Sequence, residues 1–451
     1  MDASALIRER ADRYVGWLVE ACSIPSLAEQ PDGLVEMAGW VETKLRGLGA
    51  TIERLTYEGA PDAILGKLGS GERSLLIYDH YDVQPVDPIE LWNTKPFDPE
   101  ITDGYIYARG VADNKGDLIA RLAALEAYRD LHGELPITLK FLVEGEEETG
   151  SRSFEGIVER YGDRLAADGC IWEGNAIDHT GRPDIVFGAK GLAYVELNCK
   201  LLNEDQHSAR AVVVPSAAWR LVEALATLRD PTGHVSIDGF YDDVVEPTDE
   251  DLAALEALPM DEESELVRLG TDRFIEGATG VELKRRYFYE PTCNIAGFVT
   301  GFTVPAASKT VLPKEAMAKL DMRLVPDQDP HDIVDKLRSH LDKRGFTDIT
   351  IDKFSMEHPV RSPSESLIGR AAVDAARETF QVEPVVAPMM IGTGPMYPIA
   401  HILGIPTVSP AGIHRPSSNI HAPNENAQVD DFLKIIEYTV AYLRHFSQLE
   451  A

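Results

Sequence analysis

The stretch Leu75–Asp82, LLIYDHYD, is an apolar run that ends in a histidine, one spacer residue and an aspartate. The run predicts a buried strand, and His80 and Asp82 fall where that strand ends and a loop begins. In open α/β folds this edge of the sheet holds ligands and metals. A neutral imidazole is the commonest protein metal ligand, and a nearby carboxylate can accept its other ring N–H. A single H-x-D pattern is weak evidence for a metal site. Residues elsewhere in the chain are therefore needed to judge whether His80 and Asp82 belong to one.

The overall composition is that of an ordinary globular protein. The chain has 451 residues, of which 44% are hydrophobic and 26% charged, and this length favours two or three domains. Its 75 acidic and 43 basic residues give a net charge of −32, which would repel phosphates. The charge therefore argues against a nucleic-acid or anionic-membrane partner, and no apolar run is long enough to span a bilayer.

The four cysteines, Cys22, Cys170, Cys199 and Cys293, are widely spaced and form no CxxC pair. This spacing favours a reducing, cytoplasmic location and argues against a zinc site made of thiolates. The N-terminal segment mixes acids and bases in an amphipathic pattern and lacks the features of a signal peptide. We therefore expect it to form a helix that packs on the protein.

Strand-like and helical runs alternate along most of the chain, which predicts an α/β fold around a mixed, largely parallel sheet. The pattern changes at 187–201, FGAKGLAYVELNCKL, where apolar and polar residues alternate as in a half-exposed antiparallel strand. The runs EAMAKLDMRLVPD and ITIDKFSMEH, together with two helices, extend this into a small β-α-β…β-α-β unit. We predict a larger domain made of residues 1–188 and 359–451, with a smaller α+β, ferredoxin-like domain inserted at 189–358.

Further acidic residues follow other predicted strands. Asp113 lies in YIYARGVADNKG, between a strand and an expected helix. Another apolar strand runs into EGEEE, which places Glu146, Glu147 and Glu148 together. Adjacent carboxylates raise one another's pKa unless cations neutralise them, so this cluster indicates a bound dication.

Two more candidate ligands lie farther along the chain. Glu173, in CIWEGN, follows an apolar strand, and His421 lies in the loop SNIHAPNENA near the C-terminus. Taken singly, each would be an ordinary solvated loop residue. Together, two histidines and several carboxylates at strand-to-loop edges form an N/O ligand set that suits Zn²⁺, with Co²⁺ or Mn²⁺ as alternatives.

The chain resembles the dinuclear-zinc aminoacylase, carboxypeptidase and dipeptidase family. This family includes carnosinase-type dipeptidases, acetylornithine deacetylase and succinyl-diaminopimelate desuccinylase. The matching motifs are HYDVQP, LWNTKPFDPEITDGYIYARGVADNKG, EGEEETGS, the HS pair of the insert and HAPNE. The resemblance covers nearly the whole chain. It implies a zinc-peptidase catalytic domain and an inserted lid or dimerisation domain, and we expect a homodimer in which the exposed sheet edge of the insert pairs with a second copy.

The resemblance also implies roles for the site residues. Two zinc ions per subunit would be held by these ligands: one by His80 and Glu173, the other by Glu148 and His421, and both by Asp113. The peptide bond after Asp113 would be cis. Glu147 would be the general base, and Asp82 would orient His80.

Other residues resemble those that contact the substrate. His207 resembles a histidine that reaches the active site from a partner subunit, with an exposed loop histidine as the alternative. Arg323 resembles an arginine that pairs with the free carboxylate of the substrate, with a solvent-facing strand residue as the alternative. Asn294 would also reach the substrate. A glycine loop would contact the same carboxylate through its backbone amides: Gly392, Thr393 and Gly394.

The function expected from this resemblance is hydrolysis of an amide bond in a dipeptide or before a C-terminal residue with a free carboxylate. An N-acyl-amino-acid deacylase, like acetylornithine deacetylase or succinyl-diaminopimelate desuccinylase, is the alternative, because only the groups that flank the amide differ. A non-catalytic binding protein of the same fold is a third reading, against which the intact ligand set argues. The loops HSARAVVVP and IGTGPMYP depart from the dipeptidase pattern, whereas the acidic stretch 233–290 resembles the enlarged insert of dipeptidases.

Overall fold

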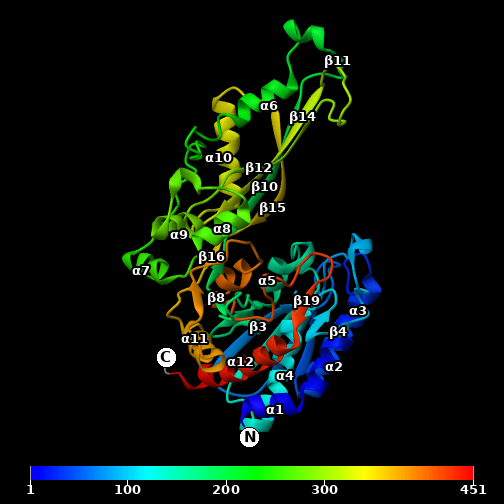
Figure 1. The fold of residues 1–451 in the computed structure, drawn as a ribbon, viewed down its shortest axis with the longest axis vertical. Helices are drawn as coiled ribbons and strands as arrows, with labels where there is room; N and C mark the ends of the chain where they lie inside the picture. The colour runs from blue at the N-terminus through cyan, green and yellow to red at the C-terminus, as the bar shows by residue number, and fades with distance from the viewer. Residues whose placement is uncertain (1, 450–451) are drawn as a thin grey trace. The chain divides into compact units, whose positions relative to one another are not determined.

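The computed structural model describes residues 2–449, and the chain divides into two compact units. The first unit comprises Met1–Gly188, Arg361–Pro388 and Pro395–Ala451, and the second comprises Ala189–Val360 and Met389–Gly394. Figure 1 shows the chain coloured along its length. The roles of the two parts, as catalytic domain and as lid or dimerisation domain, stay predictions.

One segment lies in a different unit from the one that the sequence indicated. Met389–Gly394 belongs to the second unit, although the sequence analysis assigned it to the larger domain. The backbone N–H of Lys190 donates to the carbonyls of Met390 and Gly392, at 3.2 and 3.0 Å. These hydrogen bonds join residues about two hundred positions apart in the sequence, so no local pattern indicates them.

The first unit is built around a six-stranded sheet in the order β1-β2-β6-β3-β7-β18. Its strands are β1 Thr51–Leu55, β2 Ala63–Leu68, β3 Ser74–His80, β6 Thr138–Glu144, β7 Cys170–Trp172 and β18 Thr407–Val408. The pairings of β3 with β6, β3 with β7 and β7 with β18 are parallel, whereas β1 with β2 and β2 with β6 are antiparallel. The mixed, largely parallel sheet predicted from the sequence is therefore confirmed.

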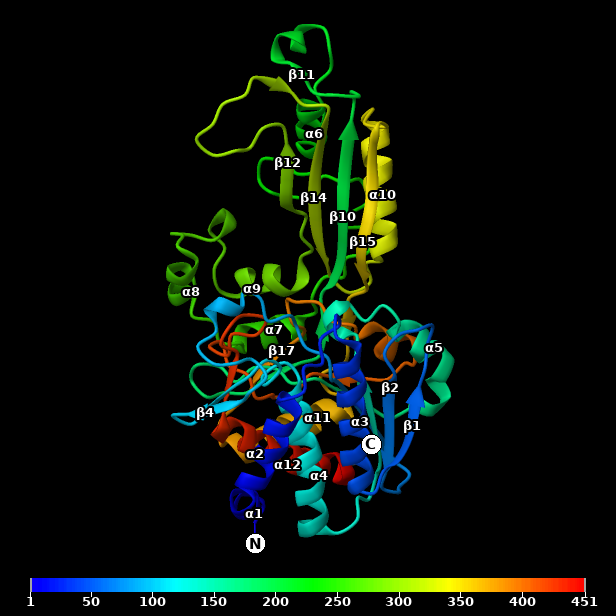
Figure 2. The ribbon, with the colours of Figure 1, turned by 90° about the vertical axis from the view of Figure 1, so that its right-hand side faces the viewer.

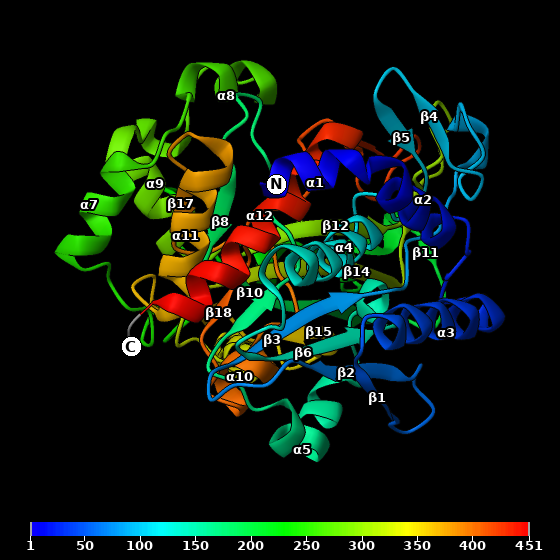
Figure 3. The same cartoon turned by 90° about the horizontal axis from the view of Figure 1, so that it is seen from below.

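Helices cover both faces of this sheet, as Figure 3 shows for α4 and α12 on one side and α5 on the other. The helices of the unit are α1 Ala3–Glu9, α2 Ala11–Cys22, α3 Pro31–Gly47, α4 Lys115–His132, α5 Phe154–Leu165, α11 Leu367–Phe380 and α12 Val429–Gln448. After their first residue, β3 and β6 are buried throughout. Double-sided burial explains why these strands read as continuous apolar runs rather than as alternating ones.

Smaller strands complete the first unit. A three-stranded sheet joins β4 Glu100–Thr102, β5 Tyr105–Tyr107 and β19 Asn426–Gln428, and β8 Asp184–Val186 pairs in parallel with β17 Val385–Ala387. The pairing of β19 with β5 attaches the chain just after the HAPNE motif to the strand before the Asp113 loop. Two segments that carry candidate ligands are thereby held side by side.

The second unit has an antiparallel four-stranded sheet in the order β12-β14-β10-β15. Its strands are β10 Gly191–Lys200, β12 Asn294–Thr300, β14 Glu315–Leu324 and β15 Ile349–Glu357. Helices α6 Ala217–Leu225 and α10 Pro330–Lys343 pack on one face of this sheet (Figures 1 and 2). Alternate residues of β10 and β14 are buried, so the sheet is one-sided. Strand order and connections are those of the predicted ferredoxin-like fold.

Two parts of the second unit were not predicted. The strand β12 lies at the sheet edge and is exposed or half-exposed at every position, so it lacks the alternation that identifies a one-sided strand. The acidic stretch 233–290 holds three short helices, α7 Asp249–Ala257, α8 Glu262–Leu269 and α9 Gly280–Tyr289. A hairpin of β11 Gln206–His207 and β13 Val311–Leu312 completes the unit.

Within residues 2–449, no helix combines the length and the apolar character that crossing a membrane requires.

Candidate metal centre

His80 is the last residue of β3, and its side chain is fully buried. Its Nδ1 lies 3.1 Å from the backbone carbonyl oxygen of Asp82 and 3.3 Å from Oδ1 of the same residue, which leaves Nε2 for a second partner. The Asp82 carboxylate also accepts hydrogen bonds from the backbone N–H groups of Glu147 and Glu148, at 3.3 and 3.0 Å. Asp82 therefore holds both the imidazole ring and the turn that carries the two glutamates.

Asp113 lies between the two candidate histidines. Its Oδ1 is 3.1 Å from Nε2 of His80, and its Oδ2 is 3.0 Å from Nε2 of His421. The peptide bond from Asp113 to Asn114 is cis, as the resemblance implies. A carboxylate that offers one oxygen to each histidine is placed to bridge two ions.

The donor atoms form two groups that share Asp113. One group adds His80 and Glu173, and the other adds Glu148 and His421, with the atoms of each group within 4.8 Å of one another. His421 Nε2 also lies 3.2 Å from Oε2 of Glu148. The five ligands expected from the sequence are thus brought together in two clusters, although they come from five separate segments of the chain.

The electrostatics of these clusters fit divalent cations. Burial, together with the negative charge of Glu147, raises the pKa of Glu173 well above its ordinary value. The hydrogen bonds to Asp113 and Glu148 raise the pKa of His421 to about 10. Buried oxygens of Glu148 and Glu173 have no hydrogen-bond partner in the described structure. Unpaired carboxylate oxygens beside imidazole nitrogens are the donors that Zn²⁺, Co²⁺ and Mn²⁺ bind, so the residues present fit a pair of such ions.

Glu147 belongs to neither cluster. It begins the short 3₁₀ turn η2 Glu147–Thr149, directly before the candidate ligand Glu148. Burial raises the pKa of Glu147, and the carboxylates of Asp113 and Glu148 add to that rise while His80 opposes it. A half-buried carboxylate beside the ligands, yet outside both groups, is free to exchange a proton.

Glu425, the last residue of the HAPNE motif, was not identified as a site residue. Its side chain is fully buried, and one oxygen accepts from the backbone N–H of Ala112 and of Asp113, at 2.8 and 3.1 Å. The other oxygen accepts from the N–H of Gly110 and from the Arg109 guanidinium, at 2.9 and 2.7 Å. Glu425 therefore fixes the loop that carries Asp113. The HAPNE motif, which ends at Glu425, was the sequence signal that could have identified this residue.

We expect Glu425→Gln to weaken metal binding by about 10–100-fold, the usual cost of losing a group that orients a ligand. An amide places an NH₂ group against donors that need an acceptor, so the Asp113 loop loses one of its anchors. Calorimetric titration of the metal-free protein with Zn²⁺ measures the effect. Glu437→Gln, at a half-exposed position of α12, is the matched control. Unchanged Zn²⁺ affinity in Glu425→Gln would contradict the proposed role of Glu425.

The predicted substrate residues lie in the second unit. Arg323 is on β14, and its guanidinium donates to the Thr393 hydroxyl at 2.5 Å, within the Gly392–Gly394 loop. Asn294 is exposed at the start of β12. His207 is exposed at the end of β11, where its Nδ1 accepts from the N–H of Ala209 at 3.2 Å. The structure brings Arg323, Thr393 and their neighbours together, and the substrate roles of all these residues stay predictions.

The sequence profile described as Peptidase family M20/M25/M40 matches residues 76–445. The chain belongs to this family. The family predicted from the sequence motifs is therefore confirmed, and the chain is a metallopeptidase-type hydrolase.

Individual relatives agree with the family. Beta-Ala-His dipeptidase of Homo sapiens is 30% identical over 414 residues, which cover 86% of this chain and 80% of the relative. Cys-Gly metallodipeptidase of Schizosaccharomyces pombe is 29% identical and covers 75% of this chain and 74% of its own. Among solved structures, the M20 family metallo-carboxypeptidase from Sulfolobus solfataricus has a TM-score of 0.90 and 38% identity, and the match covers 97% of this chain and 99% of that one.

Proposed function

We propose that the chain hydrolyses the amide bond of dipeptides, or of a C-terminal residue with a free carboxylate, at a dinuclear zinc centre. The observation that carries the proposal is the pair of donor clusters that share Asp113, with Glu147 beside them but outside both. His80 and Glu173 would hold one ion, and Glu148 and His421 the other. Zn²⁺ is the ion proposed, with Co²⁺ or Mn²⁺ as alternatives that the same donors accept.

When bound, two dications supply a water whose pKa is low enough for attack near neutral pH, and they polarise the amide carbonyl. The remaining work belongs to the side chains of this chain. Glu147 takes the proton of the attacking water at a carboxylate oxygen and hands it to the leaving amine. The Asp82 carboxylate accepts a hydrogen bond from the backbone N–H of Glu147, which anchors the main chain that carries the base.

The nature of the substrate is supported by the relatives and by Arg323. The relatives named above are dipeptidases and a carboxypeptidase, whose substrates have a free carboxylate beside the amide. An arginine fork pairs with a carboxylate through two parallel hydrogen bonds, and Arg323 would provide this contact. Binding energy at that carboxylate would favour dipeptides over amide bonds in the interior of longer peptides, which have no free carboxylate beside them.

A substrate panel tests the proposal. The protein, freed of metal and reloaded with Zn²⁺, Co²⁺ or Mn²⁺, is assayed with dipeptides and with N-acetyl and N-succinyl amino acids. We expect higher kcat/KM for dipeptides. Faster turnover of the acyl substrates would instead favour the deacylase alternative, and no turnover with correctly loaded metal would favour a non-catalytic protein.

We further propose a cytoplasmic homodimer. All four cysteines are buried and free, which suits a reducing compartment. The edge strand β12 exposes the apolar side chains of Ile295, Phe298 and Val299, which a second copy could cover. In such a dimer the exposed His207 would serve the active site of the partner.

A complementation experiment tests the shared site. We expect His207→Ala and Glu147→Gln to be inactive as separate homodimers. After subunit exchange, half of the dimers are mixed and each has one complete site, so about a quarter of wild-type activity should return. Light scattering that shows only fully active monomer, or a mixture that stays inactive although exchange has occurred, would contradict the role of His207 in its partner.

A further inference from the structure

The first two turns of α4 carry two buried charged residues, Asp117 and Arg121, which have no role in the site described above. Their side chains are 2% and 3% exposed. They are four residues apart and therefore lie on the same side of the helix, and α4 packs against β3 (Figure 3). Charged side chains are rarely buried without specific partners, so the contacts of these two residues indicate what they support.

Arg121 holds the end of β3. Its guanidinium donates through Nη1 to the Asp79 carboxylate and to the backbone carbonyl of Tyr78, the latter at 3.2 Å. Asp79 is fully buried and directly precedes His80, the last residue of the strand. The Arg121–Asp79 pair therefore fixes the main chain from which the candidate ligand His80 projects.

Asp117 holds the segment that follows Glu173. Its Oδ1 accepts a hydrogen bond from the backbone N–H of Ile413 at 3.0 Å. Its Oδ2 lies against two glycines: a Cβ atom at Gly174 would collide with this oxygen, and one at Gly412 would lie only 2.7 Å from it. Only glycine fits at these positions while Asp117 lies between them. Asp117 thus determines the path of the chain directly after the candidate ligand Glu173.

These contacts concern only one of the two donor clusters. We name each cluster after its unshared histidine: the His80 cluster is His80, Asp113 and Glu173, and the His421 cluster is Asp113, Glu148 and His421. The contacts reach the chain beside two ligands of the His80 cluster, and α4 itself begins two residues after the third, Asp113. Within residues 2–449, neither Asp117 nor Arg121 forms a hydrogen bond or ion pair with the unshared ligands of the His421 cluster.

We propose that Asp117 and the Arg121–Asp79 pair set the metal affinity of the His80 cluster and leave that of the His421 cluster unchanged. The inference rests on the proposed function only for the assignment of the two metal positions. These side chains are positioning residues, because they act on an ion through the main chain beside His80 and Glu173 and do not touch it. Changes in α4 should therefore separate the affinities of the two positions.

The test measures each metal position separately, by calorimetric titration of the metal-free protein with Zn²⁺. His421→Ala keeps the His80 cluster complete, and Glu173→Ala keeps the His421 cluster complete. In the His421→Ala background, Asp117→Ala should weaken Zn²⁺ binding by about 10–100-fold, the usual cost of losing a group that orients a ligand. In the Glu173→Ala background, the same substitution should leave the Zn²⁺ affinity unchanged.

Two further variants of α4 are the controls. Glu126→Ala removes another buried carboxylate of the helix, one that pairs with Arg13 at 2.6 Å, and should leave both positions unchanged. Asp117→Asn keeps an oxygen that can accept from the Ile413 N–H, so it should retain most of the affinity. Circular dichroism and thermal unfolding show whether each variant is folded.

A double variant gives an independent test if Asp117→Ala does not fold. Asp79→Asn combined with Arg121→Met removes both charges of the buried pair, so neither is left without its partner. The expected result is the same selective loss of Zn²⁺ affinity in the His421→Ala background.

The pattern of loss decides the proposal. Weaker Zn²⁺ binding that is confined to the His421→Ala background supports the positioning role, even if no dipeptide is hydrolysed and the proposed function fails. Equal loss in both backgrounds, as a merely structural role would give, or no loss in either, overturns it. Dipeptide hydrolysis by the wild-type protein together with equal loss would leave the proposed function standing.

Discussion

Replacing Glu147 by glutamine is expected to reduce hydrolysis by about 10²–10⁴-fold, the usual contribution of a positioned general base. The amide has the same shape as the carboxylate but cannot accept a proton from the attacking water. Because Glu147 lies outside both donor clusters, the variant should still bind two metal ions. Steady-state kinetics and the metal content of the gel-filtered protein measure the two effects separately.

The neighbouring residue provides the control for this experiment. Glu146 directly precedes the turn that Glu147 begins. Its carboxylate accepts a hydrogen bond from the Ser153 N–H at 3.1 Å, and a glutamine can accept the same bond. Glu146→Gln should therefore keep most of the activity. If Glu146→Gln were inactive and Glu147→Gln active, the register of the two glutamates would be wrong by one residue.

Replacing Asp113 by alanine is expected to remove both metal ions. The two clusters share this carboxylate, so its loss leaves each with one histidine and one glutamate. His80 and His421 also lose the group that faces their Nε2 atoms, at 3.1 and 3.0 Å. We expect no measurable hydrolysis, and no rise in Tm when Zn²⁺ is added, because a ligand stabilises a protein only when it binds the folded state.

His421→Ala is the comparison for this second prediction. It removes a ligand from one cluster and leaves His80, Asp113 and Glu173 in place. Its metal content should fall by one ion, and added Zn²⁺ should still raise its Tm. Two ions retained in Asp113→Ala, with wild-type affinity, would show that Asp113 does not bridge.

Much of the candidate site could be predicted because its signals are local. Some candidate ligands follow an apolar strand, as His80 does after β3 and Glu173 after β7. Others lie in a loop, as His421 does in the proline- and asparagine-rich segment SNIHAPNENA. Parallel strands end at the same edge of a sheet, so residues after neighbouring strands meet without further information. The motifs around them were enough to identify the family.

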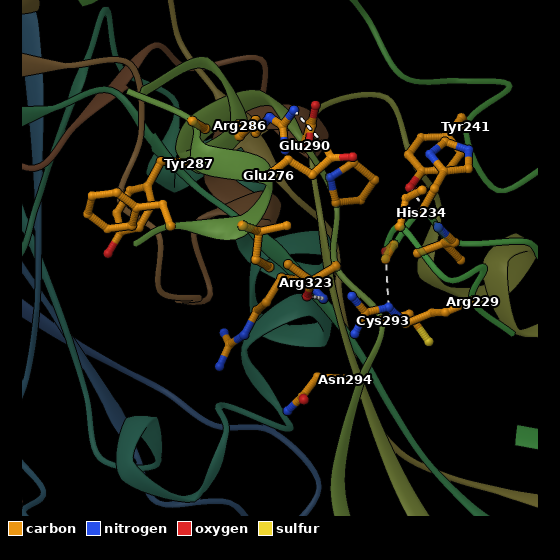
Figure 4. A pocket seen from close by; sticks show the side chains of 18 of the residues that line it. Arg229, His234, Tyr241, Glu276, Arg286, Tyr287, Glu290, Cys293, Asn294 and Arg323 are labelled. Atoms are coloured by element: carbon orange, nitrogen blue, oxygen red, sulfur yellow. Dashed lines mark hydrogen bonds and ion pairs between the residues drawn. The ribbon is translucent and has the colours of Figure 1, made fainter. Parts of the chain in front are cut away.

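Other residues could not be identified in this way. Glu425 is one of many charged loop residues in the chain. Only its hydrogen bonds to the Asp113 loop, more than three hundred residues earlier, show that it holds this loop in place. The edge strand β12 has no buried face, so its sequence has no period to detect. The lining of a cavity in the second unit (Figure 4) includes Lys190, Arg229 and Arg323, which come from three separate segments of the chain.

The sequence by itself determined the α/β class and the ferredoxin-like insert, because burial periodicity and strand ends are properties of neighbouring residues. Its motifs determined the family and indicated the candidate ligands. The tertiary structure alone decided that Met389–Gly394 joins the insert, that Glu425 supports the loop of Asp113 and that basic side chains from several segments line one cavity of the second unit. These facts depend on contacts between distant segments, and hydrogen bonds and charges act through space without regard to position in the chain. LLIYDHYD indicated where a metal could bind, and the fold brought the other ligands to it.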